Sequence, residues 1–238
     1  MTNNPSSLPW KLADKLGLTN SAKFRKAVRQ DRERDPEPYK LAESILVDFH
    51  SEGGLAGLGE MQPYKLVCLQ RLLLEIKPKV VLELGTGSSS VVFGEYSKQH
   101  DVKIVGVEES DQWAENTRAM LVKRGCDSSV ELVVSPKEIN EEEGTARYTQ
   151  VPDIEADLVL VDGPALVKDG QSYKHAACID VLALTSPKEI LVDIRHATVK
   201  HLERVLGESY VVSVSDILQR RPRSSFNYFS RLTRRDLP

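Results

Sequence analysis

One stretch decides the fold of this chain: residues 80–93, which read VVLELGTGSSSVVF. Apolar residues surround Glu83 and β-branched valines lead the run, which is typical of a parallel strand buried on both faces. Gly85 and Gly87 allow positive φ angles and a close approach of the backbone to a ligand. Three serines, which are good helix N-caps, and then Val91-Val92-Phe93 predict the start of a helix. Together they predict a strand, a glycine turn and a helix, the arrangement in which α/β proteins hold nucleotide-like ligands.

The spacing of Glu83, Gly85 and Gly87 resembles the first motif of class I S-adenosylmethionine-dependent methyltransferases, which is commonly Glu-x-Gly-x-Gly. The resemblance implies a cofactor-binding turn made of Glu83, Gly85, Thr86, Gly87 and Ser88. The dinucleotide fingerprint Gly-x-Gly-x-x-Gly fits less well, because Ser90 stands at its third glycine position. A glycine motif alone is weak, and an ordinary strand-to-helix turn without a ligand is the alternative.

A second strand ending in acid is predicted over residues 103–109, KIVGVEE. Glu108 follows Gly87 by 21 residues, close to the roughly 20-residue offset at which an acidic side chain accepts hydrogen bonds from ribose hydroxyls. The resembling methyltransferases place an acid at this strand end for the same purpose, which implies that Glu108 binds the cofactor. Glu109 is interpreted as an acid at the start of the next helix.

Two further strand ends add candidate site residues. Residues 130–134 predict a third strand, and the resemblance implies that Ser135, just past it, lines the adenine. Residues 157–164, DLVLVDGP, predict a buried strand that delivers Asp162 to the edge where doubly wound sheets bind ligands. The Asp-Gly-Pro ending is common in small-molecule O-methyltransferase-like members, which implies that Asp162 contacts the cofactor and takes part in catalysis. The Asn/Asp-Pro-Pro-Tyr/Phe ending of adenine and glutamine N-methyltransferases is absent from the sequence.

The end of the chain completes the predicted sheet. A fifth strand is predicted over residues 189–193, and two more over residues 210–214 and 226–232. A final antiparallel hairpin is characteristic of the class I methyltransferase sheet. The predicted fold class is therefore α/β: a Rossmann-like, doubly wound, seven-stranded sheet with a terminal antiparallel hairpin, and an N-terminal helical extension.

Two units are predicted along the chain, a helical extension over residues 1–59 and a methyltransferase domain over residues 60–238. The predicted helices lie at residues 6–34 (in two pieces), 39–50, 63–77, 89–99, 111–124, 172–184 and 197–206, and residues 137–150 predict a short helix and a loop. The glycine-rich residues 53–59 are either a lid over the site or a plain connection.

Composition is that of an ordinary globular protein of 238 residues with 40% hydrophobic and 28% charged residues. Both ends are basic: residues 11–34 hold eight Lys or Arg against three acids, although the whole chain has a net charge of −3. The three cysteines match no metal spacing and predict a reducing compartment. No apolar run approaches a membrane span, and no signal peptide is evident, so we expect a cytoplasmic enzyme.

The chemistry of methyl transfer to a hydroxyl needs alignment of the acceptor and removal of its proton. Catechol- and caffeoyl-type O-methyltransferases add a divalent metal, and the resemblance matches two of its ligands with Asp162 and Asp193. Ile194 stands where the third ligand, an Asn, would be, and it cannot ligate. This departure disfavours a divalent metal, which stays an alternative, and we predict no metal ligands. Without a metal, His196, just past the fifth strand, is the candidate general base. Its alternative is a helix N-terminal residue without a role.

The leading functional hypothesis is an S-adenosylmethionine-dependent methyltransferase that acts on a small-molecule or sugar hydroxyl. One alternative is an NAD-linked oxidoreductase, which Ser90 and the terminal hairpin disfavour. Another is a non-catalytic methyltransferase-like scaffold that binds a partner through its basic ends. Nucleic acid is disfavoured as the acceptor by the acidic body of the chain. The helical extension is compatible with a homo-oligomer.

Overall fold

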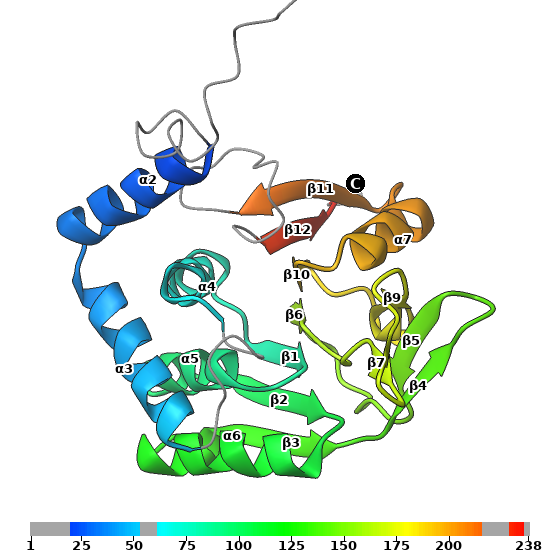
Figure 1. The fold of residues 1–238 in the computed structure, drawn as a ribbon, viewed down its shortest axis with the longest axis horizontal. Coiled ribbons are helices and arrows are strands. Elements are labelled where there is room, and N and C mark those ends of the chain that lie inside the picture. Colours follow the sequence, from blue (N-terminus) through cyan, green and yellow to red (C-terminus); the bar gives the residue numbers. More distant parts are fainter. Residues whose placement is uncertain (1–19, 53–60, 216–228, 236–238) are drawn as a thin grey trace, which may run out of the picture.

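The computed structural model describes residues 20–52, 61–215 and 229–235. Its central sheet has seven strands: β1 (Val80–Leu84), β2 (Lys103–Glu108), β3 (Val130–Val134), β6 (Leu158–Val161), β10 (Glu189–Asp193), β11 (Tyr210–Ser215) and β12 (Phe229–Arg234). They lie in the order β11-β12-β10-β6-β1-β2-β3 (Figure 1). All are parallel except β12, which runs antiparallel to both of its neighbours.

The order in which the chain adds strands to the sheet reverses between β1 and β6. From β1 the chain moves outward through β2 to β3, and it then returns to pair β6 with the other side of β1. Such a switch point leaves a crevice at the carboxyl ends of the two strands, where ligands bind. The predicted doubly wound sheet with an antiparallel final strand pair is thus confirmed.

Helices cover one face of this sheet in two layers. The inner layer holds α4 (Pro63–Ile76), α5 (Ser88–Ser97) and α6 (Asp111–Lys123), and the outer layer holds α2 (Asn20–Arg34) and α3 (Glu37–Ser51) (Figure 1). Successive residues of a strand point to opposite faces. Val81 accordingly packs into the cluster under these helices, and Leu82 packs into a second cluster on the other face.

The outer helices share the core of the domain instead of standing apart from it. Tyr39, Ile45 and Phe49 of α3 are buried in the same cluster as α4 and α5. Arg71 of α4 also donates hydrogen bonds to Asp31 and Asp35. The predicted helix at 39–50 is confirmed, whereas the first part of the helix at 6–34 and the loop at 53–59 lie outside the described residues. The boundary between two units at residue 59 stays a prediction.

The second face of the sheet differs from the prediction at two places. Residues 137–150 form strands β4 (Lys137–Asn140) and β5 (Thr145–Tyr148), where a short helix was predicted. Residues 172–184, predicted as one helix, form β8 (Gln171–Ser172), β9 (Ala177–Cys178) and the short 3₁₀ helix η2 (Asp180–Ala183). Strand β8 pairs with β7 (Val167–Lys168), whereas β9 pairs with β5 and completes a small sheet with β4.

These two predictions were wrong for one reason. The apolar residues Ala176, Ala177 and Cys178 are consecutive and all buried, because they meet β5 and not because they line one side of a helix. A pairing between segments about 30 residues apart leaves no periodic signal in either segment. With α7 (His196–Leu206), this small sheet covers the second face of the main sheet (Figure 1).

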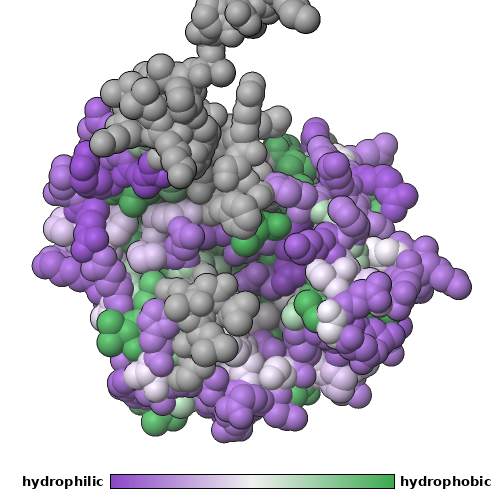
Figure 2. Space-filling view, in the orientation of Figure 1, coloured by the Kyte–Doolittle hydropathy of each residue, from purple (hydrophilic) through white to green (hydrophobic). Residues whose placement is uncertain are grey.

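The outer surface offers little apolar area in the view of Figure 2, in which hydrophilic side chains predominate and apolar ones are scattered. None of the helices in the described part of the chain combines the length and the apolar character needed to cross a membrane.

Candidate functional site

A pocket of about 360 Å³ opens at the switch point of the sheet, a volume within the usual range for small-ligand sites. Three strand ends meet there, and the residues that follow β1, β2 and β6 supply most of the lining. The lining residues are Gly85, Thr86, Glu108, Glu109, Ser110, Trp113, Asp162, Gly163, Ala165 and Arg195. Four of the residues predicted to bind a cofactor, Gly85, Thr86, Glu108 and Asp162, are therefore brought together.

The glycine turn brings the ends of β1 and β6 into contact. Gly85 has a φ of 91°, and a Cβ atom built on it would lie 2.5 Å from the amide nitrogen of Gly163. Gly87 has a φ of 157° and a ψ of −133°, a region that is essentially restricted to glycine. The predicted positive φ angles are confirmed at both glycines. The atoms that lie close to Gly85 are the backbone atoms that follow Asp162, and a close approach of these glycines to a ligand stays a prediction.

Glu83 lies beneath the turn, fully buried, and it does not line the pocket. Its two carboxyl oxygens accept hydrogen bonds of 2.5 Å from the hydroxyls of Ser89 and Ser90. The Ser90 hydroxyl also accepts a bond from the Gly87 amide, which closes the first turn of α5. Burial raises the pKa of Glu83 to about 8. Glu83 thus ties the strand to the helix, and its predicted contact with the cofactor finds no counterpart in the pocket lining.

Glu108 is 5% exposed and is held by the same turn. Its Oε2 accepts hydrogen bonds from the Thr86 amide (3.0 Å) and the Thr86 hydroxyl (3.3 Å), and its Oε1 accepts one from the Ser110 amide (3.1 Å). A carboxylate offers about four acceptor positions, so one on Oε1 is left for a ligand donor. Burial, followed by the charge of Glu109, raises the pKa of Glu108 to about 7.

Two lining residues were interpreted otherwise from the sequence. Trp113, which the sequence places only within the helix predicted over residues 111–124, donates a hydrogen bond of 2.7 Å from Nε1 to the carbonyl of Thr86 and forms part of the pocket wall. Glu109, interpreted as a plain helix-start acid, accepts from the Ala165 amide (2.9 Å) and the Tyr148 hydroxyl (3.3 Å). The only sequence signal that could have placed Trp113 in the pocket is its position five residues after the acid Glu108 at a strand end.

Five predicted site residues do not line the pocket: Glu83 and Gly87, described above, and Ser88, Ser135 and His196. Ser88 is buried at the start of α5, and Ser135 is buried where its hydroxyl accepts from the Gln150 amide (2.9 Å). His196 is exposed at the start of α7. Their roles in cofactor binding and proton transfer stay predictions.

Asp162 lies at the pocket wall with about one third of its side chain exposed. Arg195 donates a hydrogen bond to the Asp162 backbone carbonyl, and its guanidinium lies 3.9 Å from the Asp162 carboxylate. Burial raises the pKa of Asp162, although the positive charges of Arg195 and Lys65 oppose the shift. The strand end therefore presents a carboxylate that lies beside the Arg195 guanidinium.

The fifth strand end carries a second carboxylate, and a lysine is its partner. Lys65 of α4 donates to Oδ1 of Asp193, and the side chains are only 4% and 6% exposed. Burial lowers the pKa of Lys65 to about 8, against the opposing effect of Asp162. This pair was not foreseen, because nothing in the sequence marks Lys65 as different from the other residues of its helix.

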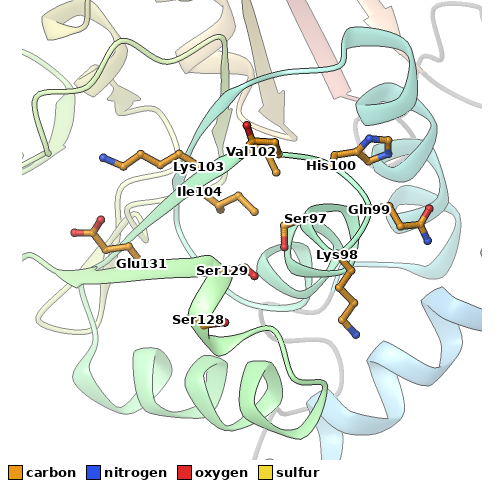
Figure 3. A pocket seen from close by; sticks show the side chains of 11 residues that line it. Ser97, Lys98, Gln99, His100, Val102, Lys103, Ile104, Ser128, Ser129 and Glu131 are labelled. Atoms are coloured by element: carbon orange, nitrogen blue, oxygen red, sulfur yellow. The ribbon is translucent and has the colours of Figure 1, made fainter.

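A larger hollow of about 610 Å³ lies elsewhere on the sheet (Figure 3). Lys103 and Ile104, at the amino end of β2, line it together with Ser128, Ser129 and Glu131. Ligands of doubly wound sheets bind at the carboxyl ends of strands, so this hollow lies at the wrong edge of the sheet to be the site.

Comparison with known proteins shows which solved structures share this fold. The sequence matches no family model, and no curated protein is similar to it at a significant level. Among solved structures, it is similar to the Podospora anserina methyltransferase PaMTH1 bound to S-adenosylhomocysteine, with 17% identity, coverage of 97% of this chain and 98% of that one, and a TM-score of 0.57.

Two further structures agree. An O-methyltransferase from Bacillus cereus in complex with S-adenosylhomocysteine has 14% identity, coverage of 82% and 91%, and a TM-score of 0.55. TomG from Streptomyces achromogenes, an O-methyltransferase of tomaymycin synthesis in complex with S-adenosylmethionine, has 18% identity, coverage of 83% and 89%, and a TM-score of 0.51. The chain has the class I methyltransferase fold.

Proposed function

We propose that this protein is an S-adenosylmethionine-dependent methyltransferase that acts on a small-molecule hydroxyl. The observation that carries the proposal is the position of Glu108, which is fixed by the glycine turn at the switch point and retains an acceptor position for a ligand. An acid at this strand end suits the ribose hydroxyls of a nucleoside cofactor.

The remaining lining residues fit the same cofactor. Gly85 and Thr86 line the pocket at the end of β1, and Trp113 gives it an apolar wall. The cofactor supplies an electrophilic methyl group on a positively charged sulfur. Three acids, Glu108, Glu109 and Asp162, line the pocket against one cation, Arg195, and this balance favours a cationic ligand over a pyrophosphate.

The choice of a hydroxyl acceptor rests on the resemblance and on the neighbours, two of which are O-methyltransferases. Proton removal from the acceptor needs a base, and His196 is the residue we propose for it. The protein also fits a reducing compartment such as the cytoplasm, since none of its three cysteines, all in the described residues, forms a disulfide.

Calorimetry with S-adenosylhomocysteine, S-adenosylmethionine and NAD tests the proposal. We expect micromolar binding of the first two by the wild-type protein and a loss of at least tenfold in Glu108→Gln. Glu131→Gln, which changes an exposed acid at the far edge of the same sheet, is the matched control. Binding of NAD alone would support the alternative of an NAD-linked oxidoreductase. If none of the three ligands binds, the result would support the alternative of a non-catalytic methyltransferase-like scaffold.

A further inference from the structure

The pair of Lys65 and Asp193 joins parts of the chain that are 128 residues apart. The lysine comes from the first turn of α4 and the aspartate from the last position of β10, and both are buried. Removing two charges from water costs several kcal/mol each in real proteins, so an ordinary stabilising contact would be made more cheaply by apolar side chains. The cost of burying this ion pair indicates a role that depends on where the pair lies in the fold.

Its position is the acceptor side of the switch point. Val192 of β10 lies opposite Val161 of β6 in parallel register, so the residues that follow them, Asp193 and Asp162, lie at the same edge. Lys65 is near enough to Asp162 for each to shift the pKa of the other. Its Nζ also lies 5.2 Å from the ring centroid of Phe229, a favourable cation–π distance. Lys65 therefore pairs with Asp193 beside an aromatic ring, at the edge of the sheet where Asp162 also lies.

The same two carboxylates are those that would hold a divalent metal in the resembling metal-dependent O-methyltransferases, and here they do not fit one. Oδ1 of Asp193 is already bound to an ammonium group. Ile194, at the position of the third ligand, has no ligating atom and adopts a φ of 41°. Within the described residues, no group of three His, Cys, Asp or Glu side chains is placed to hold a metal ion.

We propose that the Lys65 ammonium takes the place of this divalent cation, as a positioning residue that fixes Asp193 and balances the charge at the acceptor side of the site. The proposal rests on the proposed function and specifies its substrate class. A metal with open coordination positions can chelate two neighbouring oxygens, as in a catechol, whereas an ammonium is a point charge with three donors. The acceptor is thus a single hydroxyl that is methylated without chelation.

Binding of Mn²⁺ to the purified full chain tests this directly, by calorimetry and by the shift of the unfolding temperature. We expect no stoichiometric binding by the wild-type protein. Lys65→Ala empties the place of the ammonium and leaves two carboxylates, so it is expected to bind Mn²⁺ at least tenfold more tightly than the wild type and to be stabilised by it. The gain should disappear in the double variant Lys65→Ala/Asp193→Asn. Lys98→Ala, a change at a partly exposed, surface-paired lysine, is the matched control.

Stoichiometric Mn²⁺ binding by the wild type, or an S-adenosylhomocysteine complex that is lost on addition of EDTA, would overturn the proposal, as would Lys65→Ala that folds but gains no affinity for Mn²⁺. If Lys65→Ala does not fold, Lys65→Gln replaces it with the same expectation, and the wild-type measurement alone can still refute the inference. Binding of S-adenosylhomocysteine to metal-free wild type is recorded on the same samples. If the metal-free wild type does not bind S-adenosylhomocysteine, the proposed function is contradicted. The Mn²⁺ measurement still decides separately whether Lys65 occupies the place of a metal ion.

Discussion

Replacing Gly85 by alanine tests the contact between the two central strand ends. The new Cβ would lie 2.5 Å from the Gly163 amide nitrogen and 2.8 Å from both the Asp162 carbonyl carbon and the Gly163 Cα. Ordinary contacts between such atoms are about 3.5–4.0 Å, and all three atoms are backbone, so no side-chain rotation can relieve the overlap. The ends of β1 and β6 must therefore separate.

The cost has two parts. An L-residue at a φ of +91° loses about 1–2 kcal/mol, and forcing extra volume into a packed region adds about 1–3 kcal/mol. The sum is about 2–5 kcal/mol of unfolding free energy. For a chain of this size, roughly 2–4 °C of melting temperature corresponds to each kcal/mol, so we expect a loss of roughly 5–15 °C.

The matched control is Gly125→Ala. Gly125 has a φ of +62°, but a Cβ built on it has nothing within 4 Å, so only the backbone strain of about 1–2 kcal/mol applies. Urea unfolding followed by circular dichroism compares the two variants, and calorimetry with S-adenosylhomocysteine shows whether only Gly85→Ala loses binding. Equal losses of stability in the two variants, with binding retained in both, would refute the close contact between the strand ends.

Three other changes have definite expected outcomes. Burial and the charge of Glu109 raise the pKa of Glu108 to about 7; because a ribose binds the ionised form, affinity for S-adenosylhomocysteine should fall by up to about tenfold per pH unit below that value, and calorimetry of Glu108→Gln should show no such dependence. Trp113→Phe removes the bond to the Thr86 carbonyl and should cost about 1 kcal/mol in urea unfolding, with several-fold weaker cofactor binding; unchanged binding would remove Trp113 from the site. Asp31 is buried, yet its hydrogen bonds with Arg71 and Tyr39 outweigh burial and hold its pKa below 3.8, so its contribution to stability is complete above about pH 4 and is lost as the pH falls through the lowered pKa. Asp31→Asn should therefore be destabilised by about 1–3 kcal/mol at neutral pH and should lack this part of the acid sensitivity, and equal acid unfolding curves for the two proteins would contradict the role of Asp31.

The sequence could predict the main sheet because its signals are local. Residues 80–93 contain the strand, the turn and the helix start in one run, and each buried strand is short, apolar and followed by a turn residue. The acids at three strand ends could be placed for the same reason, since the carboxyl ends of parallel strands meet at one edge. Gly85 and Glu108 could be predicted as site residues from the residues next to them in the sequence.

Other features depend on pairing between residues far apart in the chain, and no local pattern predicts them. The small sheet exists because β5 meets β9, and each strand alone is too short to show a pattern. Lys65 resembles any lysine on an amphipathic helix until Asp193 is placed beside it. In the sequence, Ser90 is notable only because it stands where the dinucleotide fingerprint has a glycine. In the structure, its hydroxyl donates a hydrogen bond to Glu83 and accepts one from the Gly87 amide.

The indole of Trp113 also has a practical consequence. The chain contains two tryptophans, and this one stands in the pocket wall with its N–H bound to the carbonyl of Thr86. Indole emission responds to the polarity around the ring and to stacked or nearby heterocycles. Trp113 is therefore an intrinsic fluorescent reporter of the pocket. Its emission should change on cofactor binding, and this change should be lost in Trp113→Phe.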